Sequence, residues 1–118
     1  MIQETDLLEV TAVLTTTVGT IIGSVPVNMS AVVYAETFAE DAASGVGTYT
    51  AKLLTQSGTI ITGTVQVVTL SPTNPKLEKG FEVKPILRVP AGQALVGQTE
   101  AGTITVSLIY AYKYGRVV

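Results

Sequence analysis

Near its C-terminus the chain reads Thr103-Ile104-Thr105-Val106-Ser107-Leu108-Ile109-Tyr110-Ala111-Tyr112-Lys113-Tyr114. Larger apolar and aromatic side chains alternate here with smaller or polar ones, a period of two that is typical of a β-strand with one buried face. One face carries Ile104, Val106, Leu108, Tyr110, Tyr112 and Tyr114, and the other carries Thr103, Thr105, Ser107, Ala111 and Lys113. The stretch therefore predicts a long strand and favours an all-β fold.

The rest of the chain repeats this pattern in shorter runs separated by turn residues. Thr, Val and Ile dominate the runs, and their branched side chains favour strands over helices. The connection Gln56-Ser57-Gly58 predicts a hairpin, and Ser71-Pro72-Thr73-Asn74-Pro75, Pro90-Ala91-Gly92 and Glu100-Ala101-Gly102 predict further turns. We expect eight strands, at about residues 7–17, 20–27, 29–36, 48–56, 59–70, 80–89, 93–98 and 103–114.

Two local patterns refine this expectation. Thr37-Phe38-Ala39-Glu40 matches a helical capping box and is followed by Asp41-Ala42-Ala43 and Ser44-Gly45, which predicts one helical turn between strands. In the strand expected at 80–89, Phe81, Val83, Pro85, Leu87 and Val89 alternate with Glu82, Lys84 and Arg88. Because Pro85 has no N–H to donate, we expect that strand at a sheet edge or with a bulge.

Many short strands in 118 residues predict an antiparallel β-sandwich, and eight strands suit a jelly roll. An immunoglobulin-like Greek-key sandwich is the alternative, although the chain has no Cys and no Trp, which mark true immunoglobulin domains. We expect residues 1–118 to form a single domain with short terminal arms at about 1–6 and 115–118.

The chain is poor in charge. It has 7 Lys+Arg and 9 Asp+Glu, or 14% charged residues, with 47% hydrophobic residues and a mean hydropathy of +0.46. An average soluble chain is about 25% charged. So little charge covers a free monomer thinly, and we therefore expect other copies of the chain or a partner to cover part of its surface.

The composition also excludes several functions. The net charge of −2 offers no basic stripe, so we expect no nucleic-acid binding. With no His there is no conventional triad base, and no S-x-x-K signature occurs, so we expect no enzyme, no catalytic residues and no cofactor. The uncharged run from Val10 to Ala35 contains Thr, Pro and Asn and favours strands over a membrane span, and the acidic N-terminus does not resemble a signal peptide.

Two groups of residues are candidates for a site. Glu36, Glu40 and Asp41 form the densest acidic cluster and suggest a carboxylate pair or a Ca²⁺ site, but the calcium-loop motif is missing and a solvated turn is favoured, so we expect no metal. Tyr110, Tyr112 and Tyr114 continue an apolar row, which predicts core at one end and subunit interface at the other. Phe81 joins them as an expected interface residue, and an aromatic platform for sugars is the alternative for the tyrosines.

The segment Leu87-Arg88-Val89-Pro90-Ala91-Gly92-Gln93-Ala94-Leu95-Val96-Gly97-Gln98-Thr99, followed by Gly102-Thr103-Ile104-Thr105-Val106-Ser107-Leu108-Ile109-Tyr110, resembles the C-terminal strand-turn-strand pattern of small jelly-roll virion proteins. These include phage capsid decoration and cementing proteins. The resemblance implies a homo-oligomer, often a trimer, bound to a major capsid protein on a virion assembled in the host cytoplasm, and it transfers no catalytic residue. We therefore expect a structural assembly protein; a carbohydrate-binding or adhesin-like module and a tail, fibre or filament subunit are the alternatives.

Overall fold

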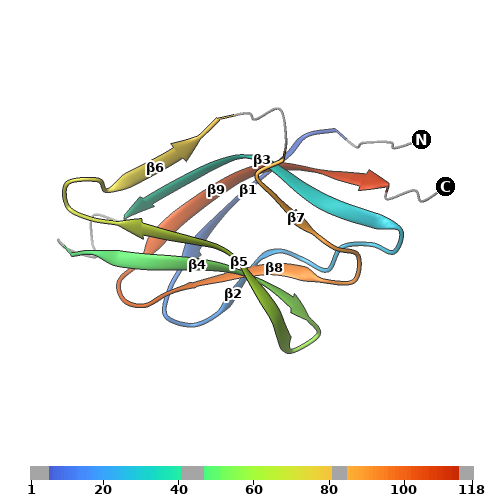
Figure 1. The fold of residues 1–118 in the computed structure, drawn as a ribbon, viewed down its shortest axis with the longest axis horizontal. Helices are drawn as coiled ribbons and strands as arrows, with labels where there is room; N and C mark the ends of the chain where they lie inside the picture. Colours follow the sequence, from blue (N-terminus) through green and yellow to red (C-terminus); the bar gives the residue numbers. More distant parts are fainter. Residues whose placement is uncertain (1–5, 41–46, 81–84, 115–118) are drawn as a thin grey trace.

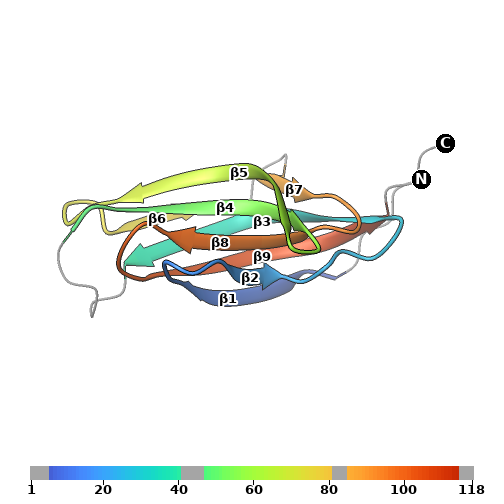
Figure 2. The ribbon, with the colours of Figure 1, turned by 90° about the horizontal axis from the view of Figure 1, so that it is seen from below.

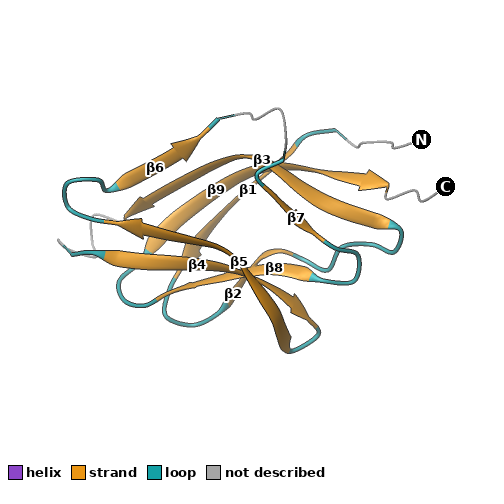
Figure 3. Ribbon diagram, viewed as in Figure 1, coloured by secondary structure: helices purple, strands orange, loops and turns teal. Residues whose placement is uncertain are grey.

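The computed structural model describes residues 6–40, 47–80 and 85–114, and these residues form strands and loops with no helix (Figure 3). None of these segments forms a helix long and apolar enough to cross a bilayer. The strands are β1 (Leu8–Leu14), β2 (Gly19–Ile22), β3 (Met29–Glu40), β4 (Tyr49–Ser57), β5 (Ile60–Leu70), β6 (Lys76–Lys79), β7 (Leu87–Val89), β8 (Ala94–Thr99) and β9 (Ile104–Tyr114).

The strands form two antiparallel sheets that pack as a sandwich (Figures 1 and 2). In the first sheet the order is β1-β9-β3-β6, with β7 also paired to β3, and in the second the order is β2-β8-β4-β5. The chain crosses repeatedly between the sheets, and its first and last strands are neighbours, as in a jelly roll. This order confirms the predicted jelly-roll sandwich and rules out the immunoglobulin-like alternative, whose strands divide differently between the sheets.

The strand expected at 80–89 is wrong in extent. Among the described residues of this range only β7 is a strand, and it pairs with Ala31–Val33 of β3. β6 lies before the expected range and pairs with Glu36–Ala39 of the same strand. Pro85 lies outside both strands and two residues before β7, so its missing N–H interrupts no described ladder. In β7, which pairs only with β3, Leu87 and Val89 are buried and Arg88 is exposed. Phe81 and Val83 lie outside the described residues.

Sequence reasoning missed β6 because its residues, Lys76-Leu77-Glu78-Lys79, include only one apolar side chain. The strand forms nonetheless, since Leu77 lies opposite the fully buried Phe38 and packs against the core.

The predicted helical turn at Thr37–Glu40 is also wrong, because β3 continues through Glu40. Phe38 pairs with Val106 of β9 on one side and with Leu77 of β6 on the other, and its side chain is 0% exposed. Ladder pairing on both sides and burial of an aromatic ring outweigh a local capping signal. Residues 41–46, where the capping pattern predicts the end of the turn, lie outside the described part of the chain.

A β-bulge in β3 changes which of its residues face the core. Val33 pairs with Tyr110 and Ala35 pairs with Ile109, so Tyr34 is an extra residue in β3. Before the bulge, Ala31 and Val33 face inward; after it, Phe38 does. The shift of one residue therefore also turns Glu36 inward, because Glu36 pairs with the core residue Leu108 and paired residues share a face.

The predicted turns are present and use glycine where the backbone requires it. The β4–β5 hairpin closes at Gly58 and Thr59, one residue later than expected, with φ of +61° at Gly58. Gly92 has φ of +78° in the turn where the Gln93 N–H donates to the Pro90 carbonyl at 3.2 Å. L-residues with a Cβ rarely adopt such angles, so these glycines determine where the chain reverses.

The burial of Phe38 gives a stability prediction. Phe38→Ala removes a fully buried ring that lies between two strands, and we expect it to lower the free energy of unfolding by about 3–5 kcal/mol in urea denaturation. Val13→Ala, at a side chain that is 58% exposed, is the control and is expected to change it by less than about 0.5 kcal/mol. Similar values for the two variants would contradict the burial of the Phe38 ring in the core.

Candidate functional site

The tyrosine row of β9 runs from the core to the surface. Ile104, Val106 and Leu108 are fully buried between the sheets, which confirms the core end of the row. Tyr110 and Tyr112 are half-buried and pack against the core, and Tyr114 is 40% exposed. The predicted interface role of the tyrosines stays a prediction, and Phe81 lies outside the described residues.

Other apolar side chains lie next to the exposed end of this row. Leu8 pairs with Tyr110, and Tyr114 pairs with Met29, which follows the exposed Val27 by two residues. We call this surface the tyrosine end; its members are Leu7, Leu8, Val27, Tyr110, Tyr112 and Tyr114. It combines exposed aliphatic side chains with phenol rings, a composition found where protein surfaces meet.

The rings of Tyr110 and Tyr112 do not lie in one plane. The rings of Tyr110 and Tyr112 are 5.7 Å apart between centroids and almost perpendicular, at 87°, so they present no common flat surface. Burial and the adjacent Tyr112 hydroxyl raise the pKa of Tyr110, which keeps its phenol neutral. This geometry favours a packing role.

Of the acidic cluster expected at Glu36, Glu40 and Asp41, the first two residues lie in the strand β3 and not in an exposed turn. Glu36 and Glu40 lie four residues apart on the inner face of β3, or about 13 Å along a strand, which is too far for a joint role on one small group. Asp41 lies outside the described residues. Across residues 6–40, 47–80 and 85–114 there is no group of three or more His, Cys, Asp or Glu residues that could hold a metal ion.

Glu36 instead joins the two sheets. Its side chain is only 2% exposed, and its Oε1 accepts a hydrogen bond of 2.7 Å from Nε2 of Gln66, which lies on β5 in the opposite sheet. The remaining oxygens, Oε2 of Glu36 and Oε1 of Gln66, are buried without a hydrogen-bond partner. Sequence reasoning missed this contact because the bulge at Tyr34, which turns Glu36 inward, leaves no periodic signal.

The two unpartnered oxygens imply that the Glu36 carboxyl prefers its neutral form. An ionised carboxylate and an amide oxygen only accept hydrogen bonds, so protonation of Glu36 supplies the missing donor. Burial raises the pKa of Glu36, and the hydrogen bond from Gln66 and the charge of Lys79, its neighbour on β6, oppose this shift only in part. More of the hydrogen-bonding groups of Glu36 and Gln66 therefore have a partner in acid than at neutral pH.

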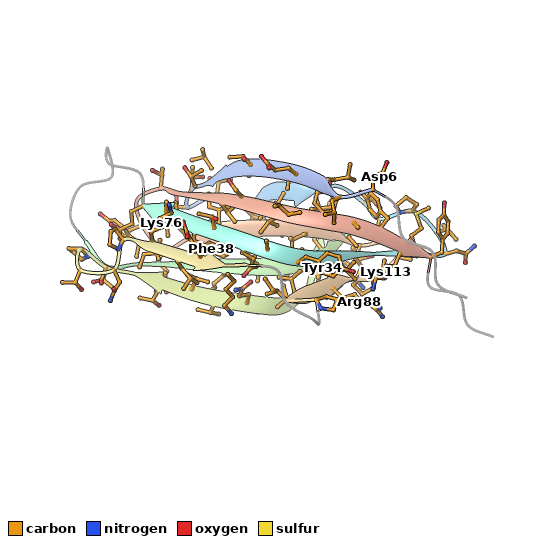
Figure 4. The ribbon with its side chains drawn as sticks, turned by 90° about the horizontal axis from the view of Figure 1, so that it is seen from above. Asp6, Tyr34, Phe38, Lys76, Arg88 and Lys113 are labelled. Carbon is orange, nitrogen blue, oxygen red and sulfur yellow. The ribbon has the colours of Figure 1, made fainter. Side chains whose placement is uncertain are left out.

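The outer face of the first sheet carries small and hydroxylated side chains. A hollow of about 160 Å³ lies there, lined by Glu9, Ala35, Glu36, Thr37, Ser107 and Ile109. Thr11 and Ser107 share a hydrogen bond of 3.0 Å across β1 and β9. Near β7 the Lys113 ammonium lies 5.6 Å from the ring centroid of Tyr34 (Figure 4). The hollow is too small for most ligands, and Glu9 supplies the one exposed carboxylate of its lining. We therefore assign no ligand to it.

Comparison with known proteins identifies the fold. No protein-family model matches the chain, and no curated protein matches it. Among solved structures, the chain is similar to a chain in the acidic stable capsid structure of Helicobacter pylori bacteriophage KHP30. The two are 12% identical with a TM-score of 0.55, over 100% of this chain and 97% of that one. At this identity the likeness is one of fold alone.

The intersheet contact predicts a pH-dependent effect of one substitution. Because the pKa of Glu36 is raised in the folded state, its contribution to stability is greatest below the unfolded value of 4.5 and is lost as pH rises through the folded value. Glu36→Gln supplies an uncharged donor, so we expect it to raise the free energy of unfolding by about 1–3 kcal/mol at pH 7 and by little at pH 4. Urea denaturation of both proteins across this pH range is the measurement.

A control variant separates this effect from removal of negative charge in general. Glu9→Gln removes an exposed carboxylate from the outer face of the same sheet and is expected to change stability little at either pH. Glu36→Gln that destabilises the protein equally at both pH values would contradict a protonated carboxyl in the intersheet contact.

Proposed function

We propose that this chain is a non-enzymatic, single-domain structural subunit of a virus particle, of the capsid decoration, cementing or coat-associated type. The observation that carries the proposal is the apolar exterior of a sandwich that is already filled inside. Ten large apolar side chains are exposed among the described residues: Leu7, Leu8, Val13, Val18, Val27, Ile60, Ile61, Val65, Val67 and Tyr114. Contact with neighbours removes such groups from water.

The fold supports this assignment. Jelly rolls are a recurrent architecture of viral capsid proteins, and the similar chain described above comes from a phage capsid structure. The resemblance of Leu87–Thr99 and Gly102–Tyr110 to small virion proteins, found in the sequence, points to the same class. The fold and the sequence pattern therefore support a role on a virus particle. The exposed apolar side chains support attachment to that particle by burial of apolar surface.

Burial is the mechanism of attachment. Each well-packed Leu, Ile or Val contributes about 1.5–3 kcal/mol before the costs of association, so a few contacts per subunit give only moderate affinity. Many subunits on one particle act together and strengthen the attachment through multivalency. We assign the contact with the coat to the tyrosine end, because Tyr114 offers a large apolar body and a hydroxyl that tolerates water at the rim.

The partners in this proposal are other copies of the chain and a major capsid protein. The trimer implied by the resemblance fits a subunit placed at local three-fold positions of a coat. A tail, fibre or filament subunit would use the same burial with a different symmetry, and electron microscopy of the particles separates the two.

Purified particles test the proposal. We expect the chain to co-sediment with virions at a fixed ratio to the major capsid protein, and particles lacking it to lose their genome at a lower temperature. Tyr114→Lys should lower its occupancy on the coat at least tenfold, because it places a charge in an apolar contact. Val13→Lys, at an exposed side chain near the opposite end of the β1–β9 ladder, is the matched control.

Recovery of the chain only as free protein, away from particles, would overturn the proposed function. Equal loss of occupancy in the Tyr114→Lys and Val13→Lys variants would leave the particle role in place but remove the tyrosine end as the contact.

A further inference from the structure

The edges of the two sheets differ in how they are protected against pairing with other chains. Exposed edge strands are usually guarded by charges, proline, bulges or short length. The β6 edge carries Lys76, Glu78 and Lys79, with an ion pair of 2.7 Å between Lys76 and Glu78. The β7 edge is three residues long and exposes Arg88, β2 is four residues long, and β1 carries Glu9 on its outer face.

The β5 edge is protected neither by charge, nor by proline, nor by short length. It is 11 residues long, lies at the margin of the second sheet, and belongs to an uncharged run of 23 residues from Leu53 to Pro75 (Figure 2). Its exposed side chains include four large apolar ones, with exposed fractions of 70% and 43% at Ile60 and Ile61 and 38% and 56% at Val65 and Val67. A long, apolar and uncharged edge of this kind is a template for another strand.

The pairing with β4 shows which part of β5 is regular. From Gln66 to Leu70 the strand pairs residue by residue with Leu53 to Tyr49. Towards the hairpin, Val65 and Thr62 are skipped in the register, so the strand bulges at two places. A partner strand therefore finds a regular ladder at Gln66–Leu70, where Val67 and Thr69 point outward and Val68 and Leu70 point to the core.

We propose that the β5 edge pairs in antiparallel fashion with β5 of a second copy, about a two-fold axis at Val68, and so joins the two four-stranded sheets into one continuous sheet. This pairing rests on the self-association in the proposed function and identifies one surface through which two copies contact each other. A two-fold contact gives a dimer, or joins two larger rings.

The chemistry of β5 favours a second copy as the occupant. When a strand pairs with its own copy about a two-fold axis, a charge at or next to the axis lies close to the identical charge of the other copy, which destabilises the contact. β5 carries no charged residue, so its self-pairing has no such repulsion. An axis at Val68 sets Gln66 opposite Leu70 and Val67 opposite Thr69, so inward residues meet inward residues and the core face continues across the contact. Pairs of β-branched residues on the outer face add to the pairing.

Substitution at Val67 tests the pairing. In sedimentation velocity at tens of micromolar we expect the wild type at twice its 12.3 kDa mass or a multiple of that, and Val67→Lys to weaken the association at least tenfold. The two introduced ammonium groups then lie diagonally across the axis, near Lys52 of each copy. Val13→Lys is the matched control, since Val13 is 58% exposed against 56% for Val67 and also lies on an edge strand.

A charge-swap experiment separates broken pairing from damaged folding. Val67→Lys also adds a repulsion with Lys52 inside its own chain, so thermal unfolding is followed for each variant. We expect an equimolar mixture of Val67→Lys and Val67→Glu chains to associate more tightly than Val67→Lys alone, because opposite charges meet across the axis. Amide hydrogens of residues 66–70 should exchange more slowly in the wild type than in folded Val67→Lys.

Several results would overturn the pairing: a monomeric wild type, a folded Val67→Lys that associates as the wild type does, or no gain in the charge-swap mixture. The proposed function is judged separately. A β5-paired dimer that never binds coat particles would contradict the virion role and support the pairing. A chain that binds the coat but associates independently of Val67 would support the virion role and contradict the pairing.

Discussion

The packing of two apolar sheet faces against each other is the interaction on which the rest of the structure depends. Strands of both sheets contribute to that layer, from Leu14 at the end of β1 to Leu108 in β9, and no disulfide reinforces it because the chain has no Cys. The chain has 47% hydrophobic residues, and not all of its large apolar side chains are buried in this layer. Most of the exposed apolar side chains lie at the tyrosine end and along β5, and these two surfaces are the ones suited to assembly.

One extra residue in β3 determines the polar content of the core. Without the bulge at Tyr34, the alternation that buries Ala31 and Val33 would bury Ala35 and expose Glu36. The bulge buries Glu36 instead, and the sandwich accommodates it with a hydrogen bond from Gln66 of the facing sheet. A buried carboxyl that is better satisfied when protonated makes the contact between the sheets sensitive to pH, since desolvation disfavours only the charged form.

Strand faces and tight turns were predictable from the sequence because both are local properties. The alternation of Ile104–Leu108 correctly identified the centre of the core, and Gly58 and Gly92 lie in the expected turns. Local patterns failed where pairing between distant segments decides the structure. Phe38 is part of a capping-box pattern, but pairing with β6 and β9 places it in a strand. β6 was not predicted because three of its four residues are charged. The inward turn of Glu36 results from a bulge that leaves no periodic trace.

Charge is distributed selectively over the sheet edges. Sixteen charged residues are few for this chain, yet five of them are Lys76, Glu78, Lys79, Arg88 and Glu9 on edge strands. The uncharged run from Val10 to Ala35 also includes an edge strand, β2, but that strand offers a partner only four residues. Only β5 is long, uncharged and apolar at once among the described edges. Because the other edges are guarded by charge or by short length, the open β5 edge is most simply explained as a contact surface.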